Sequence, residues 1–488
     1  MNEEIVPHLP FIKAYSNREA RFDFRGHSYH FSLSHGLFSS ADIDSGSRFL
    51  LKIFSNFLDD NLTGLKNPAF LSRVPPFTLL DAGSGIGVLG VCAAGALSDF
   101  FIQKNISGAG FIKCRAQDRD ELATIFSAYN AAKNGISPGN YEAYTEPLLS
   151  GPPRWNLILS NIPAKAGLPV LEDFICRSAR LLKKDGLVFL VVVNTLKDFF
   201  REKIAKEAAL YFEETGKEHT VFVYGQHEGT HTENTGTIFD EHFLNTYPFY
   251  IRTSNNYDLE GAAGQGHFQA ARPPEDTSFR LDTVYGAPDF DSPGRDIITA
   301  VKLALKINLA EKLKAAPNIV RNAASCDKNL LIHDTGQGHF ALWLANYLAE
   351  KNQHFVLSGR NVLALAASRH NLMVFSGGVP EENMTILAQR QVPEIIPCAD
   401  IYLDSERLTE SGKRFFHFIA YFPETVPGTN NHKTAWEGLA KLAEDGAIVI
   451  AAMNSTDAEH FDKKKHPAFT RMGDVKQKGF RAIAYLKK

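Results

Sequence analysis

The sequence has little cysteine and no long hydrophobic run. Its 488 residues include five cysteines and no Cys-x-x-Cys pair, which argues against a disulfide framework and a cysteine zinc site. The longest apolar run, Leu187 to Val193, is too short to cross a bilayer. The start, Met1 to Glu4, is acidic with no apolar segment behind it, so we expect no signal peptide. These absences favour a reduced, cytoplasmic protein without metal. The cysteines are Cys92, Cys114, Cys176, Cys326 and Cys398.

A large excess of charge is also absent. The formal net charge is −3 at pH 7, which argues against a protein that coats nucleic acid through bulk charge. This charge does not exclude a local basic patch, for which the C-terminal tail is the candidate, because its basic residues outnumber Asp462 and Asp474. An ordinary solvated surface explains this tail equally well. The basic residues are Lys463, Lys464, Lys465, Arg471, Lys476, Lys478, Arg481, Lys487 and Lys488.

The length predicts two domains, and the sequence repeats itself in order. Paired segments of the two halves stay collinear, with offsets between about 241 and 260 residues. Chance matches would not keep their order, so we predict a tandem duplication. The pairs are 42–48 with 289–295, 81–87 with 334–340, Asn130 with Asn371, 161–163 with 421–423, and Asn194 with Asn454.

Within each half, short apolar runs alternate with helical stretches, which predicts a doubly wound α/β fold with a mostly parallel sheet. We therefore expect two tandem Rossmann-like domains, residues 1–245 and 246–488. A stretch of about 226–277, rich in Gly, Asn, His and Thr, is the expected linker. Expected strands are 77–81, 111–117, 157–160, 187–193 and 447–453, and expected helices are 121–133 and 170–182.

A glycine loop, Asp81-Ala82-Gly83-Ser84-Gly85-Ile86-Gly87, follows the strand at 77–81. Glycines let the backbone turn tightly and let a ligand approach without a Cβ in the way. A nicotinamide-binding loop would carry its third glycine at position 88, which is Val88. The spacing favours a cofactor without a pyrophosphate, and Asp81 can accept hydrogen bonds from its cationic amine.

An acid also stands at the end of the second strand, in Asp118-Arg119-Asp120. Asp118 can accept hydrogen bonds from both ribose hydroxyls of a nucleoside. Its alternative role is a helix N-cap, for which Asp120 is better placed. Together with the glycine loop, Asp118 indicates a nucleoside-containing cofactor.

The combination resembles class I S-adenosylmethionine-dependent methyltransferases over about residues 30 to 226. That family carries Asp-x-Gly-x-Gly-x-Gly after its first strand and an acid after its second. The resemblance implies S-adenosyl-L-methionine as the cofactor. It places at the cofactor Asp81, Gly83, Ser84, Gly85, Gly87, Asp118 and Arg119.

A third motif, Asn161-Ile162-Pro163, follows the strand at 157–160. It looks like the Asn-Pro-Pro-aromatic motif of enzymes that methylate planar nitrogens, in which the Asn oxygen and the next carbonyl accept hydrogen bonds from the target NH₂. The resemblance implies catalytic roles for all three residues, with Asn161 also beside the cofactor. Ala164 and Lys165 are candidate substrate contacts and replace the stacking aromatic, which counts against guanine more than against nitrogen methylation.

The segment before the loop is similar to the "methyltransferase small" group. Gly36 to Ser39 and Ile43 to Ser47 carry the likeness, which implies that Phe38, Ser39 and Asp44 lie near the cofactor or shape its loop. That group includes tandem-domain small-subunit rRNA guanine-N2 methyltransferases. Their degenerate half comes first, whereas here it would come second. The implied partner is RNA, with rRNA favoured. We expect a monomer or homodimer that does not associate with a membrane.

The second half has changed at the chemical positions. It keeps Asp334, Gly336 and Gly338, but Gly359 replaces the ribose acid and Tyr421 replaces Asn161. We expect a retained fold without catalysis, used for stability or substrate binding. A weak ligand site around Gly336 to His339 is the alternative. Five histidines in loops are expected not to bind metal: His227, His231, His242, His333 and His339.

Four functions are therefore compatible with the sequence. The first is an RNA nitrogen methyltransferase, typical of rRNA processing. The second is a protein methyltransferase that acts on a glutamine amide, since such enzymes use a related Asn-Pro-Pro-Tyr motif. The third is a binding or scaffold protein with decayed methyltransferase folds, and a small-molecule methyltransferase is a weaker fourth.

Overall fold

The computed structural model divides the chain into two compact units. They comprise Met1–Phe243 with Val426–Gly428, and Leu244–Thr425 with Thr429–Lys488. No helix in the described part is long and apolar enough to cross a membrane. The structure describes residues 9–38, 40–60, 62, 76–104, 112–150, 155–227, 239, 243–264, 278–289, 291–315, 328–333, 336–348, 353–375, 394–397, 416–423, 426 and 432–488.

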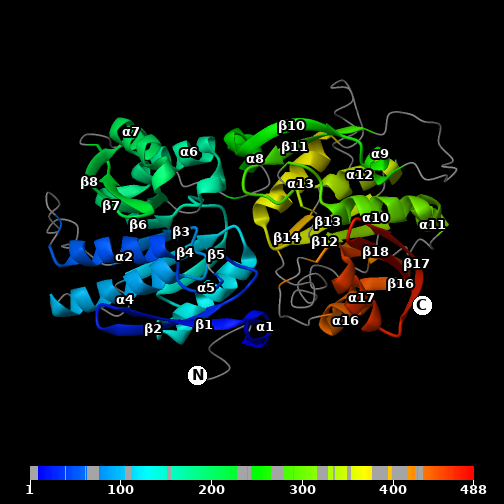
Figure 1. Cartoon of the computed structure of the whole chain (residues 1–488), viewed down its shortest axis with the longest axis horizontal. Coiled ribbons are helices and arrows are strands. Elements are labelled where there is room, and N and C mark those ends of the chain that lie inside the picture. Colours follow the sequence, from blue (N-terminus) through cyan, green and yellow to red (C-terminus); the bar gives the residue numbers. More distant parts are fainter. Residues whose placement is uncertain are drawn as a thin grey trace. The chain divides into compact units, whose positions relative to one another are not determined.

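The first unit is built on a seven-stranded sheet. In spatial order its strands are β5 (Tyr141–Thr145), β4 (Ile112–Asp118), β3 (Phe77–Ala82), β6 (Trp155–Asn161), β7 (Leu182–Val193), β9 (His219–Gly225) and β8 (Ala209–Thr215) (Figure 1). The first five run parallel, and β9 is antiparallel to both of its neighbours. The carboxyl ends of the parallel strands therefore meet at one edge, where such folds bind ligands.

Helices cover both faces of this sheet. On one face lie α2 (Ser45–Leu58), α4 (Val88–Gln103) and α5 (Glu121–Lys133), and on the other α6 (Leu168–Arg180) and α7 (Lys197–Glu207) (Figure 1). Short 3₁₀ turns precede α6 and α7: η2 (Ala164–Ala166) and η3 (Asn194–Leu196). A helix α1 (Leu9–Tyr15) and a hairpin of β1 (Arg18–Phe24) and β2 (His27–Leu33), which sequence analysis did not predict, come first.

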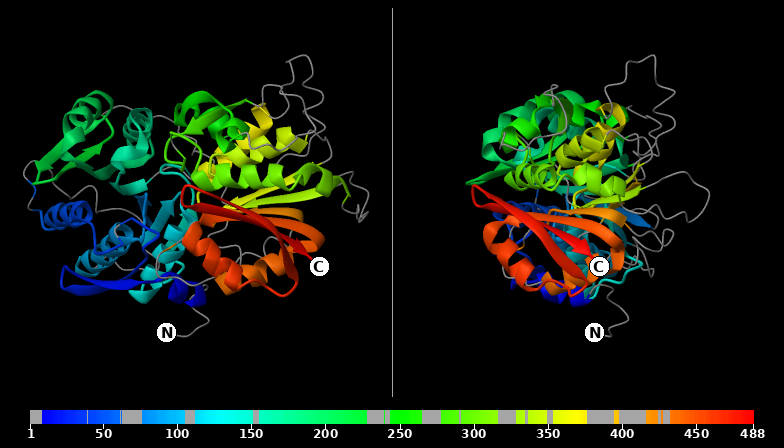
Figure 2. Two further views of the ribbon diagram at one scale, coloured as in Figure 1. Left: turned by 45° about the vertical axis from the view of Figure 1, so that its right-hand side comes forward. Right: turned by 90° about the vertical axis from the view of Figure 1, so that its right-hand side faces the viewer.

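The second unit repeats this topology. Its sheet has the order β14 (Glu394–Pro397), β13 (Gln353–Gly359), β12 (Lys328–His333), β15 (Phe416–Tyr421), β16 (Ala443–Asn454), β18 (Phe480–Lys487) and β17 (Phe469–Gln477). One face is covered by α10 (Arg295–Lys306), α12 (His339–Leu348) and α13 (Val362–Phe375). The other carries α16 (His432–Leu442) and α17 (Ser455–Lys463), in orange (Figure 2). Matching strand orders confirm the duplication and the tandem α/β fold.

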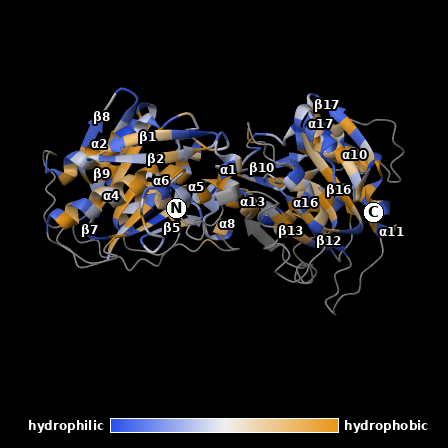
Figure 3. Ribbon diagram, turned by 90° about the horizontal axis from the view of Figure 1, so that it is seen from below, coloured by the Kyte–Doolittle hydropathy of each residue, from blue (hydrophilic) through white to orange (hydrophobic). Residues whose placement is uncertain are grey.

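Side chains of successive residues in β12 pack into two different hydrophobic cores of the second unit, one on each face of the sheet. Leu330 and Ile332 of β12 pack with α10 and α12, whereas Leu331 between them packs with α16. Side chains of a strand alternate between faces, so a strand covered on both faces is apolar throughout. Figure 3 shows the contrast between the hydrophobic β16 and the more hydrophilic edge strand β8.

The expected linker is partly folded. The stretch of about 226–277 contains α8 (Phe243–Thr246), η4 (Pro248–Tyr250), β10 (Ile251–Tyr257) and α9 (Leu259–Ala263). β10 pairs antiparallel with β11 (Phe279–Val284), as β1 pairs with β2, and the short α11 (Leu309–Ala315) follows α10. The polar residues of β10 concealed this strand, because none of its residues is buried and no alternation of apolar and polar residues results.

Strand pairing corrects the correspondence between the two halves. Leu79 of β3 pairs with Cys114 and Leu157, and Leu330 of β12 pairs with Phe355 and Phe418. Gly87 and Gly338 stand directly before α4 and α12, so Asp81, six positions before Gly87, corresponds to Ile332. The expected match with Asp334, which lies outside the described residues, was two positions out of register.

The same register moves other pairs. Asn161 corresponds to Phe422 rather than Tyr421, and Val193 rather than Asn194 corresponds to Asn454. The N-cap Asp44 of α2 corresponds to Gly294 before α10, so the match between 42–48 and 289–295 was three positions out. Loop lengths differ between the copies, and hydrogen-bonded pairing rather than a few shared letters sets register. The replacement of Asp118 by Gly359 agrees with the pairing.

Candidate active site

Backbone conformations that favour glycine shape the loop between β3 and α4. Gly83, Gly85 and Gly87 have φ of 75°, 52° and 88°, in the left-handed region. The N–H groups of Gly83 and Ser84 each donate to the carbonyl of Gln117 at 2.9 Å, which holds the loop against the end of β4. A Cβ on Gly85 would meet nothing within 4 Å. The backbone at Gly85 is therefore free of side-chain atoms on its Cβ side, which leaves space for a ligand.

Asp81 is fully buried beneath this loop. Its Oδ2 accepts a hydrogen bond from the Gly90 N–H at 2.7 Å. Burial raises the pKa of Asp81 to about 7; the Gly90 bond opposes the rise, and the charge of Asp118 adds to it. Asp81 Oδ1 and Ser84 Oγ are buried without hydrogen-bond partners in the described part of the chain. Unpaired buried polar atoms are costly, so this pair fits a ligand that brings donors or positive charge.

Asp118 at the end of β4 is oriented by backbone groups. Its Oδ2 accepts from the Gly85 N–H and its Oδ1 from the Asp120 N–H, both at 3.0 Å. Burial and then the neighbouring Asp120 raise its pKa. Each oxygen keeps a further lone pair for a ribose hydroxyl. Asp120 caps α5 through the Leu122 N–H, as predicted, and Arg119 lies partly exposed between the two acids.

Asn161 lies at the end of β6, next to the loop. Its Nδ2 donates to Asp44 Oδ2 at 2.7 Å and to Ser47 Oγ at 3.1 Å. Because a carboxylate only accepts hydrogen bonds, this contact fixes which way the amide points. Asn161 Oδ1 makes no hydrogen bond to a described residue. Ser160 Oγ donates to the Ala82 carbonyl at 2.8 Å and ties the ends of β6 and β3 together.

Two residues around Asn161 were missed from the sequence. Ser47 donates its N–H to Asp44, the N-cap of α2, so the Asp-x-x-Ser capping spacing could have revealed it. His219 begins β9, and a Cβ on Gly46 would lie 2.9 Å from Asp44 Oδ2 and 3.2 Å from His219 Nε2. The sheet brings this imidazole close, and no local spacing predicts it.

The remaining predicted residues surround this centre less closely. Ile162 is buried, whereas Pro163, Ala164 and Lys165 are exposed around η2. The Phe38 side chain is 76% exposed on the turn after β2. Ser39 lies outside the described residues. Of this group, Ile162 to Lys165 follow directly on Asn161 and extend the same edge of the sheet.

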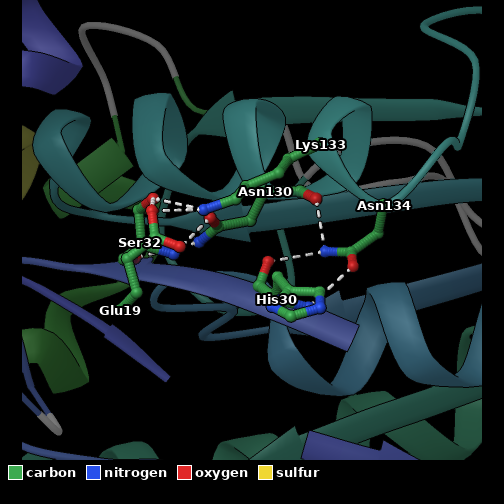
Figure 4. A network of polar contacts seen from close by, with 6 residues as sticks. All are labelled: Glu19, His30, Ser32, Asn130, Lys133 and Asn134. Atoms are coloured by element: carbon green, nitrogen blue, oxygen red, sulfur yellow. Dashed lines mark hydrogen bonds and ion pairs between the residues drawn. The ribbon is translucent and has the colours of Figure 1, made fainter. Parts of the chain in front are cut away.

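A polar network holds the N-terminal hairpin and the glycine loop on α5 (Figure 4). Asn130 Oδ1 accepts from the Ser32 N–H, and its Nδ2 donates to the Ser32 carbonyl. The same Nδ2 also donates to the Ile86 carbonyl in the glycine loop. Lys133 pairs with Glu19, and the Asn134 amide bonds both backbone groups of His30. Asn130 therefore links β2, α5 and the loop.

The copy repeats this asparagine but not the chemistry. Asn371 accepts from the Asp282 N–H and donates to the carbonyls of Asp282 and Gln337. These bonds match those of Asn130, so their role is to maintain the fold. In contrast, Ile332, Phe422, Gly359 and Gly294 replace Asp81, Asn161, Asp118 and Asp44.

The glycine loop of the copy is also obstructed. A Cβ on Gly336, the counterpart of Gly85, would lie 2.4 Å from Asp289 Oδ2. Burial and the nearby Asp296 raise the pKa of Asp289 to about 7. His339 is buried without a hydrogen-bond partner among the described residues, and burial lowers its pKa to about 4; His333 contacts Ser358 at 2.7 Å. The open space of the first unit is filled here by a carboxyl group.

Comparison with known proteins finds a family match within the first unit. Residues 28–209 match the family model "Methyltransferase small domain". This confirms the resemblance drawn from the glycine loop and the segment before it.

Two relatives illustrate the extent of the similarity. The chain is similar to an uncharacterised Bacillus subtilis (strain 168) protein, YbxB, with 28% identity over 196 residues, 39% of this chain and 82% of that protein. The structure is similar to the Thermus thermophilus 16S rRNA N2 methyltransferase RsmC, solved in complex with AdoMet and guanosine. That match covers 98% of this chain and 100% of the other, with a TM-score of 0.50 and 14% identity. At this identity, the second likeness shows the fold.

Proposed function

We propose that the protein is an S-adenosylmethionine-dependent N-methyltransferase and that its N-terminal domain, residues 1–245, acts on an exocyclic base nitrogen of RNA. The observation that carries the proposal is the Asn161 amide beside the glycine loop, turned by Asp44 so that Oδ1 is left to accept. The target fits rRNA guanine N2, and residues 246–488 serve stability or substrate binding.

The residues of the loop fit the cofactor. Bound cofactor supplies an activated methyl group on a sulfonium. Asp81 Oδ1 and Ser84 Oγ, unpaired among the described residues, would receive its charged methionine end. Asp118 would hold the ribose hydroxyls, and the open side of Gly85 would admit the ligand. The buried Asp81 would bind better in its charged form, because a nearby cation lowers a carboxyl pKa.

Asn161 would position the acceptor nitrogen. Its Oδ1 and the Ile162 carbonyl would accept the two hydrogens of the target NH₂, which directs the nitrogen lone pair away from the amide and toward the methyl group. Methyl transfer from a sulfonium needs alignment more than a base. Asp44 and Ser47 prevent the amide from rotating, so the geometry is set before the substrate binds.

RNA is the proposed substrate class for two reasons. RsmC, which shares the tandem fold, carries rRNA N2 methyltransferase in its name. The exposed Lys165 follows the Asn161 motif and could pair with a phosphate. The protein would act as a monomer or homodimer in the cytoplasm.

The test is transfer of labelled methyl from S-adenosylmethionine to unmodified ribosomal and transfer RNA. We expect label that nuclease removes and protease does not, and we expect Asn161→Ala to lose this label while still binding S-adenosylmethionine. Label that survives nuclease and disappears with protease would refute the RNA proposal and point to a protein acceptor, such as the glutamine amide of the alternative hypothesis.

Calorimetry separates an enzyme from a scaffold. The intact chain should bind S-adenosylmethionine, and Asp118→Ala should weaken binding at least about tenfold because the ribose contacts are lost. Absence of binding by the intact chain, or equal binding by the variant, would refute the cofactor assignment.

A further inference from the structure

Three side chains with metal-ligating atoms meet in the second unit. His432 begins α16, and Asp457 and His460 lie on α17. One ligand atom from each lies within 4.8 Å of the other two. Sequence analysis did not single out His432 or His460. These two histidines lie on helices that β16 separates in the chain, so no local spacing connects them.

The fold, rather than the three side chains, brings the two helices together. The indole N–H of Trp436 donates to the Phe461 carbonyl at 2.8 Å, and the two rings stack at 4.4 Å between centroids. His432 lies one helical turn before Trp436, and Asp457 one turn before Phe461. Residues one turn apart share a helix face, so this buried contact aims His432 and Asp457 at each other.

The carboxylate of Asp457 is held in position by Asn454. Asn454 caps α17 by accepting the Asp457 N–H at 3.0 Å, and its Nδ2 donates to Asp457 Oδ2. The other carboxylate oxygen therefore stays available. Hydrogen bonds of this kind hold ligating carboxylates in protein metal sites.

The first unit serves as an internal control. The pairing of β7 with β9 and of β16 with β18 puts α6 and α7 in register with α16 and α17. The three positions are Leu171, Leu196 and Phe199 in the first unit, all apolar. The helix contact therefore does not require polar groups, and all three ligand-type residues occur only in the second unit.

We propose that His432, Asp457 and His460 bind one divalent transition-metal ion of the zinc class. Two imidazoles and a carboxylate suit Zn²⁺, Co²⁺ or Ni²⁺, whereas Mg²⁺ and Ca²⁺ prefer all-oxygen sites. Metal–ligand bonds of about 2.0–2.1 Å put tetrahedral ligand atoms roughly 3.3 Å apart, so the side chains close inward on binding. Water completes the coordination, and the ion links α16 to α17. The site is independent of methyl transfer.

The test is calorimetric titration of metal-stripped full-length protein with ZnCl₂ and, separately, MgCl₂. We expect one Zn²⁺ per chain, a rise in the thermal midpoint with Zn²⁺ and no response to Mg²⁺. His460→Ala removes an exposed ligand and should weaken Zn²⁺ binding at least about tenfold. Asn454→Ala should weaken it about 10–100-fold by releasing the carboxylate.

A variant that copies the first unit provides the matched control. The triple substitution His432→Leu, Asp457→Leu and His460→Phe keeps an apolar helix contact and should fold but bind no Zn²⁺. His466→Ala, in the same unit but outside the cluster, should bind as the parent does. Equal Zn²⁺ binding by the parent and the triple variant, or by the parent and His460→Ala, would overturn the proposal. Cobalt spectra of the parent give an independent readout of nitrogen and oxygen ligation.

Discussion

Asn161 and Asp44 are hydrogen-bonded to each other, and both are replaced at the corresponding positions of the second unit, by Phe422 and Gly294. An amide has a donor end and an acceptor end, and only its acceptor end can hold a target amino group. Asp44 occupies the donor end at 2.7 Å. We therefore propose a positioning role for Asp44, in addition to its capping of α2.

The first prediction is that Asp44→Ala lowers kcat by about 10–100-fold and leaves S-adenosylmethionine affinity unchanged. A hydrogen bond to a charged group contributes about 1.5–3 kcal/mol, which corresponds to that range. Asp44→Asn should restore part of the rate, because its oxygen can still accept from Asn161. Asp42→Ala, next to the pair and exposed, is the control. Steady-state kinetics check this, and an equal loss of cofactor affinity would point to a structural role instead.

The second residue-scale prediction concerns Asp289, whose carboxyl covers Gly336. The folded unit raises its pKa from 3.8 to about 7, so the folded state holds this proton more tightly than the unfolded state. Its contribution to stability is full below about pH 4 and is lost as pH rises through about 7. Asp289→Asn should therefore flatten the pH profile and stabilise the unit at pH 8, by on the order of 1–4 kcal/mol.

Denaturant unfolding at pH 5 and pH 8 measures this effect. Asn tolerates the φ of 55° at this position, so the backbone should not be disturbed. Asp291→Asn, an exposed neighbour paired with Arg252, should leave the profile unchanged. A profile that falls as steeply in Asp289→Asn as in the parent would contradict the prediction.

At the scale of elements, comparing Gly85 in the glycine loop with Gly135 after α5 distinguishes the cost of backbone strain from the effect of blocking a ligand. Gly85 and Gly135 both have positive φ, and a Cβ on either would meet nothing within 4 Å. Gly85 faces the proposed cofactor, whereas Gly135 ends α5 after Asn134. The two positions therefore share the backbone cost of a substitution but not its consequence for binding.

We predict that Gly85→Ala and Gly135→Ala each cost about 1 kcal/mol of stability, because both would hold a side chain in the left-handed region. Only Gly85→Ala should weaken S-adenosylmethionine binding, at least about tenfold, since its Cβ enters the space next to Asp118. Thermal unfolding and calorimetry measure the two effects. Similar affinity losses in both variants would show that the loop responds to general destabilisation.

Most central elements could be predicted from the sequence because they are long and strongly patterned. The predicted limits of α5, 121–133, agree with the structure, and β3, β4 and β6 each begin or end within two residues of expectation. The edge strands β8 and β5 escaped notice, because their apolar patterns are shorter or interrupted by polar residues, and the inner strand β9 escaped as well. Helix α6 ends at Arg180, since the chain turns directly into β7.

At the scale of the whole molecule, two copies of one fold share a chain but differ in chemistry. The first unit offers Asp81, Asp118 and an open Gly85, and the second offers Ile332, Gly359 and an obstructed Gly336. Asn130 and Asn371 keep the same hydrogen bonds in both. Duplication thus separates the residues that maintain the fold from those proposed to bind the cofactor.

We therefore predict one S-adenosylmethionine per chain. Titration calorimetry should give a stoichiometry near one, and Gly359→Asp should not create a second site, because Asp289 and Ile332 still oppose binding. A stoichiometry near two would show that the second unit keeps a cofactor site.

The sequence by itself determined the tandem α/β architecture and the identity of the chemical groups at each strand end. These depend on local order: apolar runs form strands, glycines allow turns, and an acid after a strand lies at the ligand edge. The glycine loop and Asp118 were therefore found from their spacing, and Asn161 from the resemblance of its motif to that of nitrogen methyltransferases. Only the tertiary structure showed which residues contact one another across the chain. It joined Asp44 to Asn161 across 117 positions, set the true register between the copies and brought His432 to Asp457, because sheet pairing and helix packing act between residues far apart in the chain.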